Sequence, residues 1–391
     1  MDMVEIVNLR KTGAEAMRRG DARAARESFQ RLADAGQADV NIWIALAASH
    51  GRLEDIPAAH AAADRALALE ARNLRALIVK GDLHAKQGDV RSASAFYMTA
   101  LQAAPPLSEL TADLRADLER ANAMCQQHSQ QFEQELAREL GAAGFGGRAS
   151  SPRFAQSLDL LFGRKQIFFQ QPRYYFFPEL PQIQFFDRAS LPWLDRVEAA
   201  TAEIREELLS ILEDTAAFKP YVERDPRHPA DQDNRMAGNA EWSAFYLVKN
   251  GTPTAENVAR CPKTMAALAD VPFPRIPNRS PSILFSLMQP GGHIPPHNGF
   301  INTRMICHLP LIVPGGCYFR VGNEEREWVE GKAWAFDDTM QHEAWNRSNR
   351  TRVVLLFEAW RPELTEEERG FVTAMFKAID LHGGDLSDWG I

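Results

Sequence analysis

Apolar, small and acidic residues recur every 34 positions over the first hundred residues of the chain. The repeated sets are Leu9, Trp43 and Leu77; Gly13, Ala47 and Gly81; Asp21, Asp55 and Asp89; Ala25, Ala59 and Ala93; and Phe29, Ala63 and Tyr97. A period of this length fits two helices and a turn per unit, with small residues where the two helices cross closely. We expect the turns near residues 20–21, 54–55 and 88–89. The pattern therefore predicts three helical hairpins within residues 1–106.

These repeats resemble the tetratricopeptide repeat, in which antiparallel helix pairs stack into an array. Three units are about the smallest stable stack. Such arrays present a concave face to a partner or pack against the rest of their own chain. The repeats therefore favour a peptide or protein partner, or a purely structural role. An alanine-rich helical bundle without true repeats is the alternative interpretation.

A polar segment and a glycine-rich joint follow the repeats. The sequence predicts a capping helix from about residue 107 to residue 140. Glycines between residues 141 and 147, and the Ser-Ser-Pro at 150–152, then break the helix. We therefore divide the chain into helical repeats at 1–106, a capping helix and flexible joint at 107–150, and a second domain at 151–391.

The second domain begins with aromatic side chains and ends in short strands. Nine aromatic residues between positions 162 and 186 indicate core packing and a domain-docking surface, or alternatively a substrate platform. An amphipathic pattern predicts a helix over residues 194–218. Strands are expected at 242–248, 283–288, 305–313, 317–321, 332–336 and 352–360. Short strands separated by turns predict a sandwich or jelly roll, so the fold class is α+β and multidomain.

Composition and charge exclude several classes of protein. The 391 residues are 45% hydrophobic and 25% charged, with a net charge of −8. The negative charge argues against a broad, sequence-independent grip on nucleic acid. We expect no signal peptide and no transmembrane segment, because no apolar run is long enough. The four cysteines form no CxxC pair, which favours a reducing, cytoplasmic location.

Two histidines in the strand-rich half are candidate metal ligands. His297 and His342 stand 45 residues apart, on either side of an apparent hairpin, and imidazole is a common ligand of iron, copper, nickel and zinc. An oxygenase facial triad would add a carboxylate two residues after the first histidine, but Gly299 stands there. Three alternatives remain open: two histidines with water, a carboxylate from Asp337 or Asp338, or no metal.

Arg352 is the candidate partner of an anionic cosubstrate. It stands ten residues after His342, at the start of the final apolar strand. An arginine that enters a barrel interior costs free energy unless it meets an anion. Its planar fork suits a carboxylate, in a contact of about 1.5–3 kcal/mol. An arginine at a strand end in water is the alternative.

A dense set of motifs runs from residue 282 to residue 364. It comprises SILFSLMQPGGHIPPHNG at 282–299, NTR at 302–304, HLPL at 308–311, GC at 316–317, RVGNE at 320–324, FDD at 336–338, HEAW at 342–345 and WRPEL at 360–364. As a set these motifs resemble the aspartyl/asparaginyl β-hydroxylase family of iron(II)/2-oxoglutarate-dependent dioxygenases. Many relatives in that family also carry N-terminal tetratricopeptide repeats.

The resemblance implies a double-stranded β-helix, a jelly-roll and cupin-like fold, that uses Fe(II), 2-oxoglutarate and O2. It implies iron ligation by His297 and His342 without a protein carboxylate, so Gly299 is the residue expected at its position. The protein would supply geometry and a shielded cavity, while the metal carries out the difficult step.

The resemblance also implies a cosubstrate site. Arg352 and Ser286 would bind the 2-oxoglutarate carboxylate, and His308 would line the same pocket. In the animal hydroxylases an arginine two residues before the His308 position also contacts the cosubstrate. Ile306 stands there in this chain, and the nearest arginine is Arg304, which we take as a further candidate contact.

The resemblance implies a hydroxylase and leaves its substrate open. Family members act on Asp or Asn in peptides, on lipid-linked acyl chains and on free amino acids. An Asp or Asn side chain of a peptide or protein is the leading hypothesis. A free amino acid, small molecule or lipid acyl chain is the second, and a non-catalytic adaptor built on the repeats is the third. The polar loop over residues 220–235 is interpreted either as an acid-binding loop or as a solvated one.

Overall fold

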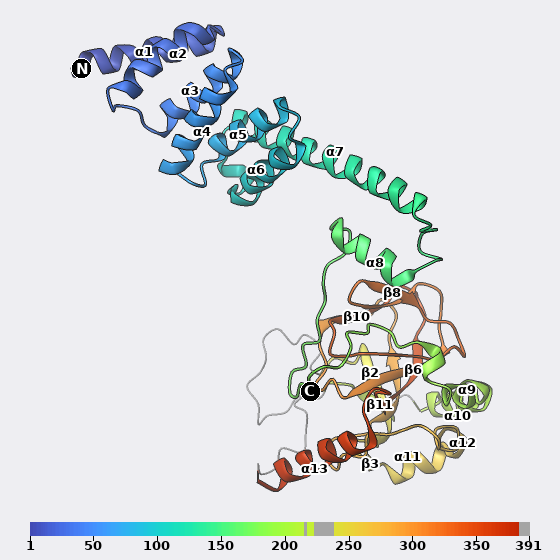
Figure 1. Cartoon of the computed structure of the whole chain (residues 1–391). Helices are drawn as coiled ribbons and strands as arrows, with labels where there is room; N and C mark the ends of the chain where they lie inside the picture. Colours follow the sequence, from blue (N-terminus) through green and yellow to red (C-terminus); the bar gives the residue numbers. More distant parts are fainter. Residues whose placement is uncertain (215–216, 223–237, 383–391) are drawn as a thin grey trace. The chain divides into compact units, whose positions relative to one another are not determined.

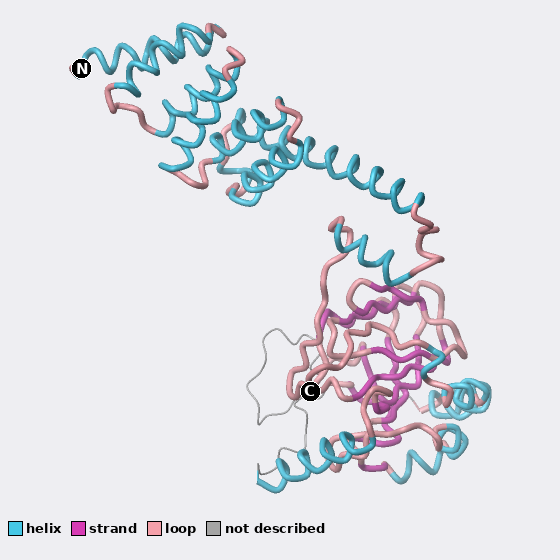
Figure 2. The backbone as a smooth tube through the Cα atoms, viewed as in Figure 1, coloured by secondary structure: helices cyan, strands magenta, loops and turns pink. Residues whose placement is uncertain are grey.

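A computed structural model of the chain describes residues 1–214, 217–222 and 238–382. Its contacts divide the chain into two units, Met1–Phe162 and Gly163–Ile391. Within the described residues, the first unit holds helices and turns, whereas the second combines strands with helices (Figures 1 and 2). Each unit has hydrophobic cores of its own.

The first unit contains three helical hairpins, and they confirm the predicted period. The helices are α1 (Met3–Arg19), α2 (Ala22–Asp34), α3 (Val40–Arg52), α4 (Ile56–Leu69), α5 (Leu74–Lys86) and α6 (Val90–Ala103). Asp21, Asp55 and Asp89 each precede the second helix of a hairpin, and each side chain accepts a hydrogen bond from the backbone N–H three residues later. An aspartate there satisfies one otherwise unpaired donor of the first helical turn. The 34-residue spacing of the aspartates is therefore a spacing of helix starts.

Small residues let the two helices of a hairpin approach closely. A Cβ added at Gly13 would lie 2.6 Å from the ring of Phe29, and one at Gly81 would lie 2.5 Å from the ring of Tyr97. The middle hairpin carries alanines at the corresponding positions, 47 and 63, and both are fully buried. Each hairpin therefore pairs an aromatic ring with a glycine, or two methyl groups with each other.

A long helix follows the third hairpin. The turn η1 (Leu107–Glu109) leads into α7 (Ala112–Ala142), and α8 (Pro152–Leu161) comes next. Leu118 and Ala121 of α7 are buried in one cluster with Leu77 and Tyr97. The first turns of α7 thus cover the last hairpin, as a capping helix would.

The two units divide at residues 162–163, whereas the sequence places a domain boundary at 150–151. The difference is α8, which is held to the loop before it. Arg148 pairs with Asp159 at 2.8 Å, and the rings of Phe145 and Phe154 meet edge to face at 5.0 Å. These contacts tie α8 to residues 145–148, and α8 falls within the first unit.

Two antiparallel sheets form the framework of the second unit. One contains β1 (Lys219–Pro220), β2 (Trp242–Lys249), β4 (Ile283–Met288), β11 (Arg352–Trp360), β6 (Arg304–Ile312) and β9 (Trp334–Phe336) in this order, with β3 (Thr252–Pro253) beside β2. The other has the order β5 (His293–His297), β10 (His342–Asn346), β7 (Cys317–Val321) and β8 (Glu324–Glu327). All six predicted strands are present. The strands β5, β8 and β10 escape prediction because they are short and carry polar or proline residues instead of an apolar run.

Side chains of the large sheet alternate between two faces, as successive residues of a strand do. One face packs in a large core against α9 (Leu194–Ala199), α10 (Thr201–Leu212), α11 (Ala255–Arg260) and α12 (Pro262–Ala267). On β11 this face is formed by Val353, Leu355 and Phe357. The opposite face packs against the inner face of the small sheet in a second core. Even-numbered residues of β6 and β11 therefore lie between the two sheets.

The helices of the second unit differ from the prediction in extent. A single helix over 194–218 is wrong: α9 and α10 are separate helices that break at Ala200, and α10 ends at Leu212. At the break, the Thr201 hydroxyl donates to the carbonyl of Glu198 at 2.6 Å, which satisfies an acceptor in place of the helical bond. The helix α13 (Glu366–His382) follows the last strand. None of the described helices is long and apolar enough to cross a membrane.

The aromatic segment between residues 162 and 186 largely has a packing role. Tyr175 and Phe177 pack in a cluster around Trp360 and Phe376, and Phe185 and Phe186 enter the two main cores. Its backbone also lies beside the two loops next to the histidines, since Gln171 donates to the carbonyl of residue 339 at 2.8 Å and Arg173 donates to that of residue 299 at 2.9 Å.

Candidate active site

His297 and His342 lie opposite each other on neighbouring strands of the small sheet. They are register partners in the β5–β10 pair, and their ring centroids are 4.0 Å apart. Nδ1 of His297 lies 2.8 Å from the carbonyl oxygen of Pro295, and Nδ1 of His342 lies 3.0 Å from that of Met340. A carbonyl only accepts, so each Nδ1 carries the proton and each Nε2 keeps its lone pair for a metal ion.

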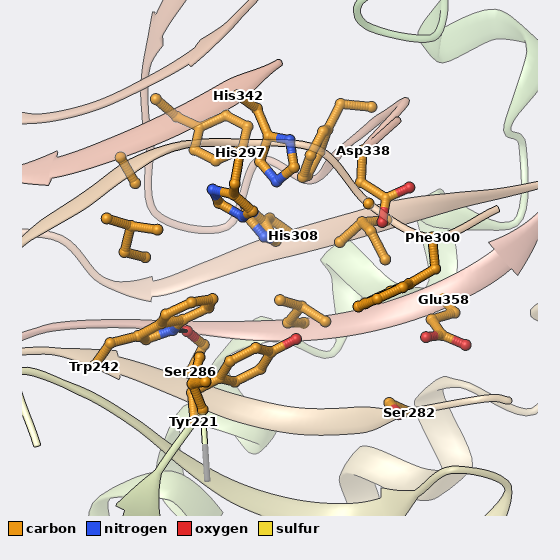
Figure 3. A pocket seen from close by; sticks show the side chains of 18 of the residues that line it. Tyr221, Trp242, Ser282, Ser286, His297, Phe300, His308, Asp338, His342 and Glu358 are labelled. Atoms are coloured by element: carbon orange, nitrogen blue, oxygen red, sulfur yellow. Dashed lines mark hydrogen bonds between the residues drawn. The ribbon is translucent and has the colours of Figure 1, made fainter. Parts of the chain in front are cut away.

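Burial keeps both imidazoles neutral. It lowers the pKa of His297, and it lowers the pKa of His342 well below the ordinary value, with a further contribution from the neighbouring His297. The neutral ring is the form that binds a metal. In Figure 3 these two rings and that of His308 gather at one place in the pocket.

The space beside Gly299 is filled by Asp338. A Cβ at position 299 would lie 2.0 Å from Asp338 Oδ2. Asp337 is engaged elsewhere, because its carboxylate accepts hydrogen bonds from Arg361 at 2.8 Å and from Gln170 at 2.6 Å. Within the described residues, no three His, Cys, Asp or Glu side chains stand close enough together to hold a metal ion. Of the alternatives that the sequence leaves open, a pair of histidines is the donor set that this geometry offers.

Arg352 is buried without a carboxylate partner among the described residues. Its exposed fraction is 2%, and its guanidinium lies 4.6 Å from the centre of the Trp328 ring. Its N–H groups donate to the Ser286 carbonyl at 3.3 Å and to the Met288 sulfur at 3.7 Å, while Nε finds no partner in this part of the chain. Burial lowers the pKa of Arg352 to about 10.

The other buried guanidiniums in the described part of the second unit each meet a carboxylate. The pairs are Arg304 with Asp338 at 3.2 Å and Glu358 at 2.9 Å, Arg361 with Asp337 at 2.8 Å, and Arg279 with Asp380 at 2.5 Å. An isolated buried cation costs several kcal/mol. The position of Arg352 therefore fits a site that receives an anion from solution.

Ser286 and His308 lie on the strands at either side of β11 and complete this anion site. Trp242 Nε1 donates to the Ser286 hydroxyl at 3.0 Å, which leaves the hydroxyl proton to donate onward. Trp328 Nε1 donates to His308 Nδ1 at 3.3 Å, so His308 carries its proton on Nε2. Burial and the nearby Arg352 hold the pKa of His308 well below its usual value. A carboxylate would thus meet a cation, a hydroxyl and a neutral N–H donor.

All of these groups face one cavity between the sheets, with a volume of about 360 Å³. The six residues that the sequence singles out all line it: Ser286, His297, Arg304, His308, His342 and Arg352. Five of them form the two groups just described. Arg304 instead lies with Asp338 and Glu358, and Figure 3 shows these two carboxylates away from the imidazoles, near Phe300.

Some of the residues that line the cavity were not identified from the sequence. Glu358 could have been found, because it stands six positions after Arg352 on the same strand, and residues of equal parity share a face. Tyr221 stacks on Trp242 with ring centroids 3.9 Å apart, and nothing in its local sequence indicates this. The basic side chains of the predicted acid-binding loop, Arg224, Arg227, His228 and Arg235, lie outside the described residues.

Comparison with known proteins shows what the part of the chain around this site is similar to. Residues 198–362, which include every residue of the two groups, match the model of the aspartyl/asparaginyl beta-hydroxylase family. This part of the chain is similar to that family. The double-histidine pair and the anion site described above both lie within the matched residues.

Curated proteins that are similar to this part of the chain are named as hydroxylases. The ornithine lipid ester-linked acyl 2-hydroxylase of Rhizobium tropici is 34% identical over 45% of this chain and 60% of its own length. The aspartyl/asparaginyl beta-hydroxylase of Mus musculus is 37% identical over 38% of this chain and 20% of its own. The aspartate beta-hydroxylase domain-containing protein 2 of Homo sapiens is 29% identical over 53% and 55%. The chain thus spans 60% or less of the length of each.

Solved structures match about a third of the chain at low similarity. A complex of the TPR2B domain of yeast Sti1 with pHsp70 is 18% identical over 33% of this chain and 98% of its own, with a TM-score of 0.29. PcrH from Pseudomonas aeruginosa is 20% identical over 33% and 95%, with a TM-score of 0.30. The three helical hairpins are established by their own geometry.

Proposed function

We propose that this chain is an iron(II)- and 2-oxoglutarate-dependent hydroxylase. The observation that carries the proposal is that two kinds of group lie on opposite walls of one cavity. One wall carries two neutral histidines, each with Nε2 unprotonated. The other carries a buried arginine that has no carboxylate partner among the described residues. The hydroxylase names of the relatives support an enzyme. With it we propose that the two sheets form a double-stranded β-helix, since their inner faces enclose the site.

Each part of the donor set suits one part of the cofactors. His297 and His342 would hold the metal through Nε2, with their rings oriented by the carbonyls that accept from Nδ1. Arg352 and Ser286 would bind the distal carboxylate of 2-oxoglutarate, and His308 would donate to the same molecule. When bound, iron and 2-oxoglutarate with O2 supply the oxidation that converts a C–H bond to C–OH, with succinate and carbon dioxide as co-products.

The protein's own contribution is binding, orientation and exclusion of water. The aromatic rings of Trp328, Phe319 and Phe336 line the cavity around the anion site. Their apolar surface strengthens the attraction between Arg352 and a carboxylate, because charges interact more strongly where water is excluded. The neutral state of His308 keeps a single N–H directed at the cosubstrate.

For the substrate, an Asp or Asn side chain of a peptide or protein is the leading proposal, supported by the family match and by the murine relative's name. A lipid acyl chain is the second, supported by the name of the Rhizobium relative; a free amino acid or small molecule stays open beside it. The helical repeats would serve as the peptide-binding part. The four free cysteines suit the proposed cytoplasmic location.

The test is an anaerobic titration with iron(II) and 2-oxoglutarate, followed by the visible charge-transfer band of the complex. His297→Ala and His342→Ala should abolish the band. His293→Ala is the matched control, because His293 lies on the same strand but stacks on Trp345 on the outer face, and it should retain the band. Absence of the band in the folded, unaltered protein would refute the oxygenase and favour a non-catalytic adaptor.

A further inference from the structure

Among the described residues, the end of the cavity around Arg304 carries no spare positive charge. The Arg304 guanidinium lies 3.2 Å from Asp338 and 2.9 Å from Glu358, and all three residues are at least nine-tenths buried. One cation therefore faces two carboxylates. The net charge is negative when both are ionised and zero when one is protonated, so it is not positive in either state.

Glu358 is built into this arrangement by the strand pairing. Glu358 lies on β11. Arg304 lies on the adjacent strand β6, where its register partner is Trp360 of β11. Trp360 stands two positions after Glu358, so the side chains of Glu358 and Arg304 are on the same face of the sheet. The Ser280 hydroxyl donates to the other oxygen of the Glu358 carboxylate. The carboxylate is thus held from two sides and keeps Arg304 neutralised.

Apart from Arg352 at the anion site, the other cations that line the cavity among the described residues do not replace this charge. Arg173 is exposed, and its guanidinium lies 5.6 Å from the centre of the Phe300 ring. Lys249 is half-buried, and its ammonium lies 5.2 Å from the centre of the Tyr246 ring. A cation in contact with water attracts an anion weakly, so these two residues do not create a buried anion site beside Arg304.

Two buried atoms of the Arg304–Asp338 pair lack a hydrogen-bond partner among the described residues. Arg304 Nε is a donor, and Asp338 Oδ1 is an acceptor. A carboxamide offers both an acceptor and donors, whereas a carboxylate offers only acceptors. The pair is therefore better matched by an amide than by an acid.

We propose that the group received beside Arg304 is an uncharged carboxamide, and that Glu358 sets this selectivity by neutralising Arg304. The inference rests on the proposed function, which places the substrate in this cavity. Within the leading substrate class it selects an Asn side chain over Asp. A carboxylate at this place would meet an already neutralised guanidinium and at least one like charge, and the juxtaposition of like charges disfavours the wrong partner.

The test compares N-acetyl-asparagine methylamide with N-acetyl-aspartate methylamide, which differ only in the side-chain group. Binding of each to the metal-free full chain is measured by saturation-transfer NMR, which detects weak ligands and does not depend on the metal. We expect the asparagine compound to bind the unaltered protein at least about tenfold more tightly, a difference of about 1.4 kcal/mol. In Glu358→Gln the preference should shift by at least about tenfold toward the aspartate compound, because Arg304 then faces one carboxylate instead of two and the charge of the cluster becomes more positive by one unit.

Ser280→Ala is the control, since it removes a contact of Glu358 but leaves its charge, and it should keep the preference for the amide. Equal binding of the two compounds, tighter binding of the acid, or binding of neither would overturn the proposal on the unaltered protein alone, even where Glu358→Gln does not fold. The charge-transfer band is a separate readout: its absence refutes the oxygenase, and its presence with the wrong compound preference refutes only the selectivity.

Discussion

Replacing Arg352 with methionine should stabilise the protein that lacks cosubstrate while abolishing 2-oxoglutarate binding. Burial lowers the Arg352 pKa from 12.5 to about 10, which corresponds to a cost of about 3 kcal/mol for holding the charge, at about 1.4 kcal/mol per pKa unit. Neutral pH lies well below both the unfolded and the folded pKa of Arg352, so the arginine is charged in both states and the full cost of burying its charge is present. The substitution also removes the contact with the Trp328 ring at 4.6 Å, worth about 2 kcal/mol in a desolvated place. The net expectation is a gain of about 1 kcal/mol.

Thermal unfolding with and without manganese(II) and 2-oxoglutarate measures both effects. Without ligands, Arg352→Met should unfold about 2–4 °C higher than the unaltered protein, as a domain of this size does for a gain of about 1 kcal/mol. With 2-oxoglutarate at a hundred times its dissociation constant, the unaltered protein should gain about 2.7 kcal/mol. Arg352→Met should gain far less, since its cosubstrate site lacks the cation.

Arg361→Met is the matched control for the first effect. Arg361 is also fully buried, but its guanidinium pairs with Asp337 at 2.8 Å. Removing it leaves a buried carboxylate without its partner, which costs about 3–5 kcal/mol. The reasoning is refuted if Arg352→Met destabilises the ligand-free protein as strongly as Arg361→Met does, or if Arg352→Met keeps the full stabilisation by 2-oxoglutarate.

Two further predictions concern pH and the repeats. The pKa values of His308 and His342 lie well below the ordinary 6.5. As the pH drops below 6.5, these histidines therefore take up protons in the unfolded chain but not in the folded chain. The unfolding free energy of the metal-free protein should then decrease, by up to about 1.4 kcal/mol per pH unit for each histidine. Urea unfolding at pH 7.5 and 5.5 measures this fall, and an equal fall in His308→Gln would contradict the assignment. In the repeats, Gly81→Ala places a Cβ 2.5 Å from the Tyr97 ring and should cost about 1–3 kcal/mol. The double variant Gly81→Ala/Tyr97→Ala has alanines at the two positions where the middle hairpin also has them. Its loss of unfolding free energy should be smaller than the sum of the losses in the two single variants. If urea unfolding shows that the losses add, the contact between position 81 and the Tyr97 ring is not the cause.

Periodicity made the helical unit predictable. Each aspartate of the 34-residue pattern precedes a helix and accepts the hydrogen bond expected of a helix start, because capping depends on residues only three positions apart. The long apolar strands were predictable for a similar reason, since β11 is buried along its whole length. The break between α9 and α10 was not, because a hydrophobic pattern continues through it and only a local side-chain bond marks the end of the helix.

The sequence by itself determined the hairpins, the main strands and, through its motifs, six residues that line one cavity. It could not determine which of their neighbours meet them. The register of the two short strands β5 and β10 brings His297 opposite His342. The pairing of β6 with β11 decides which side chains of the same face are neighbours, and it brings Glu358 to Arg304 but no carboxylate to Arg352 among the described residues. The two carboxylates that neutralise Arg304, those of Asp338 and Glu358, stand 34 and 54 positions after it in the sequence. Only the folding of the strands against one another brings these residues into contact.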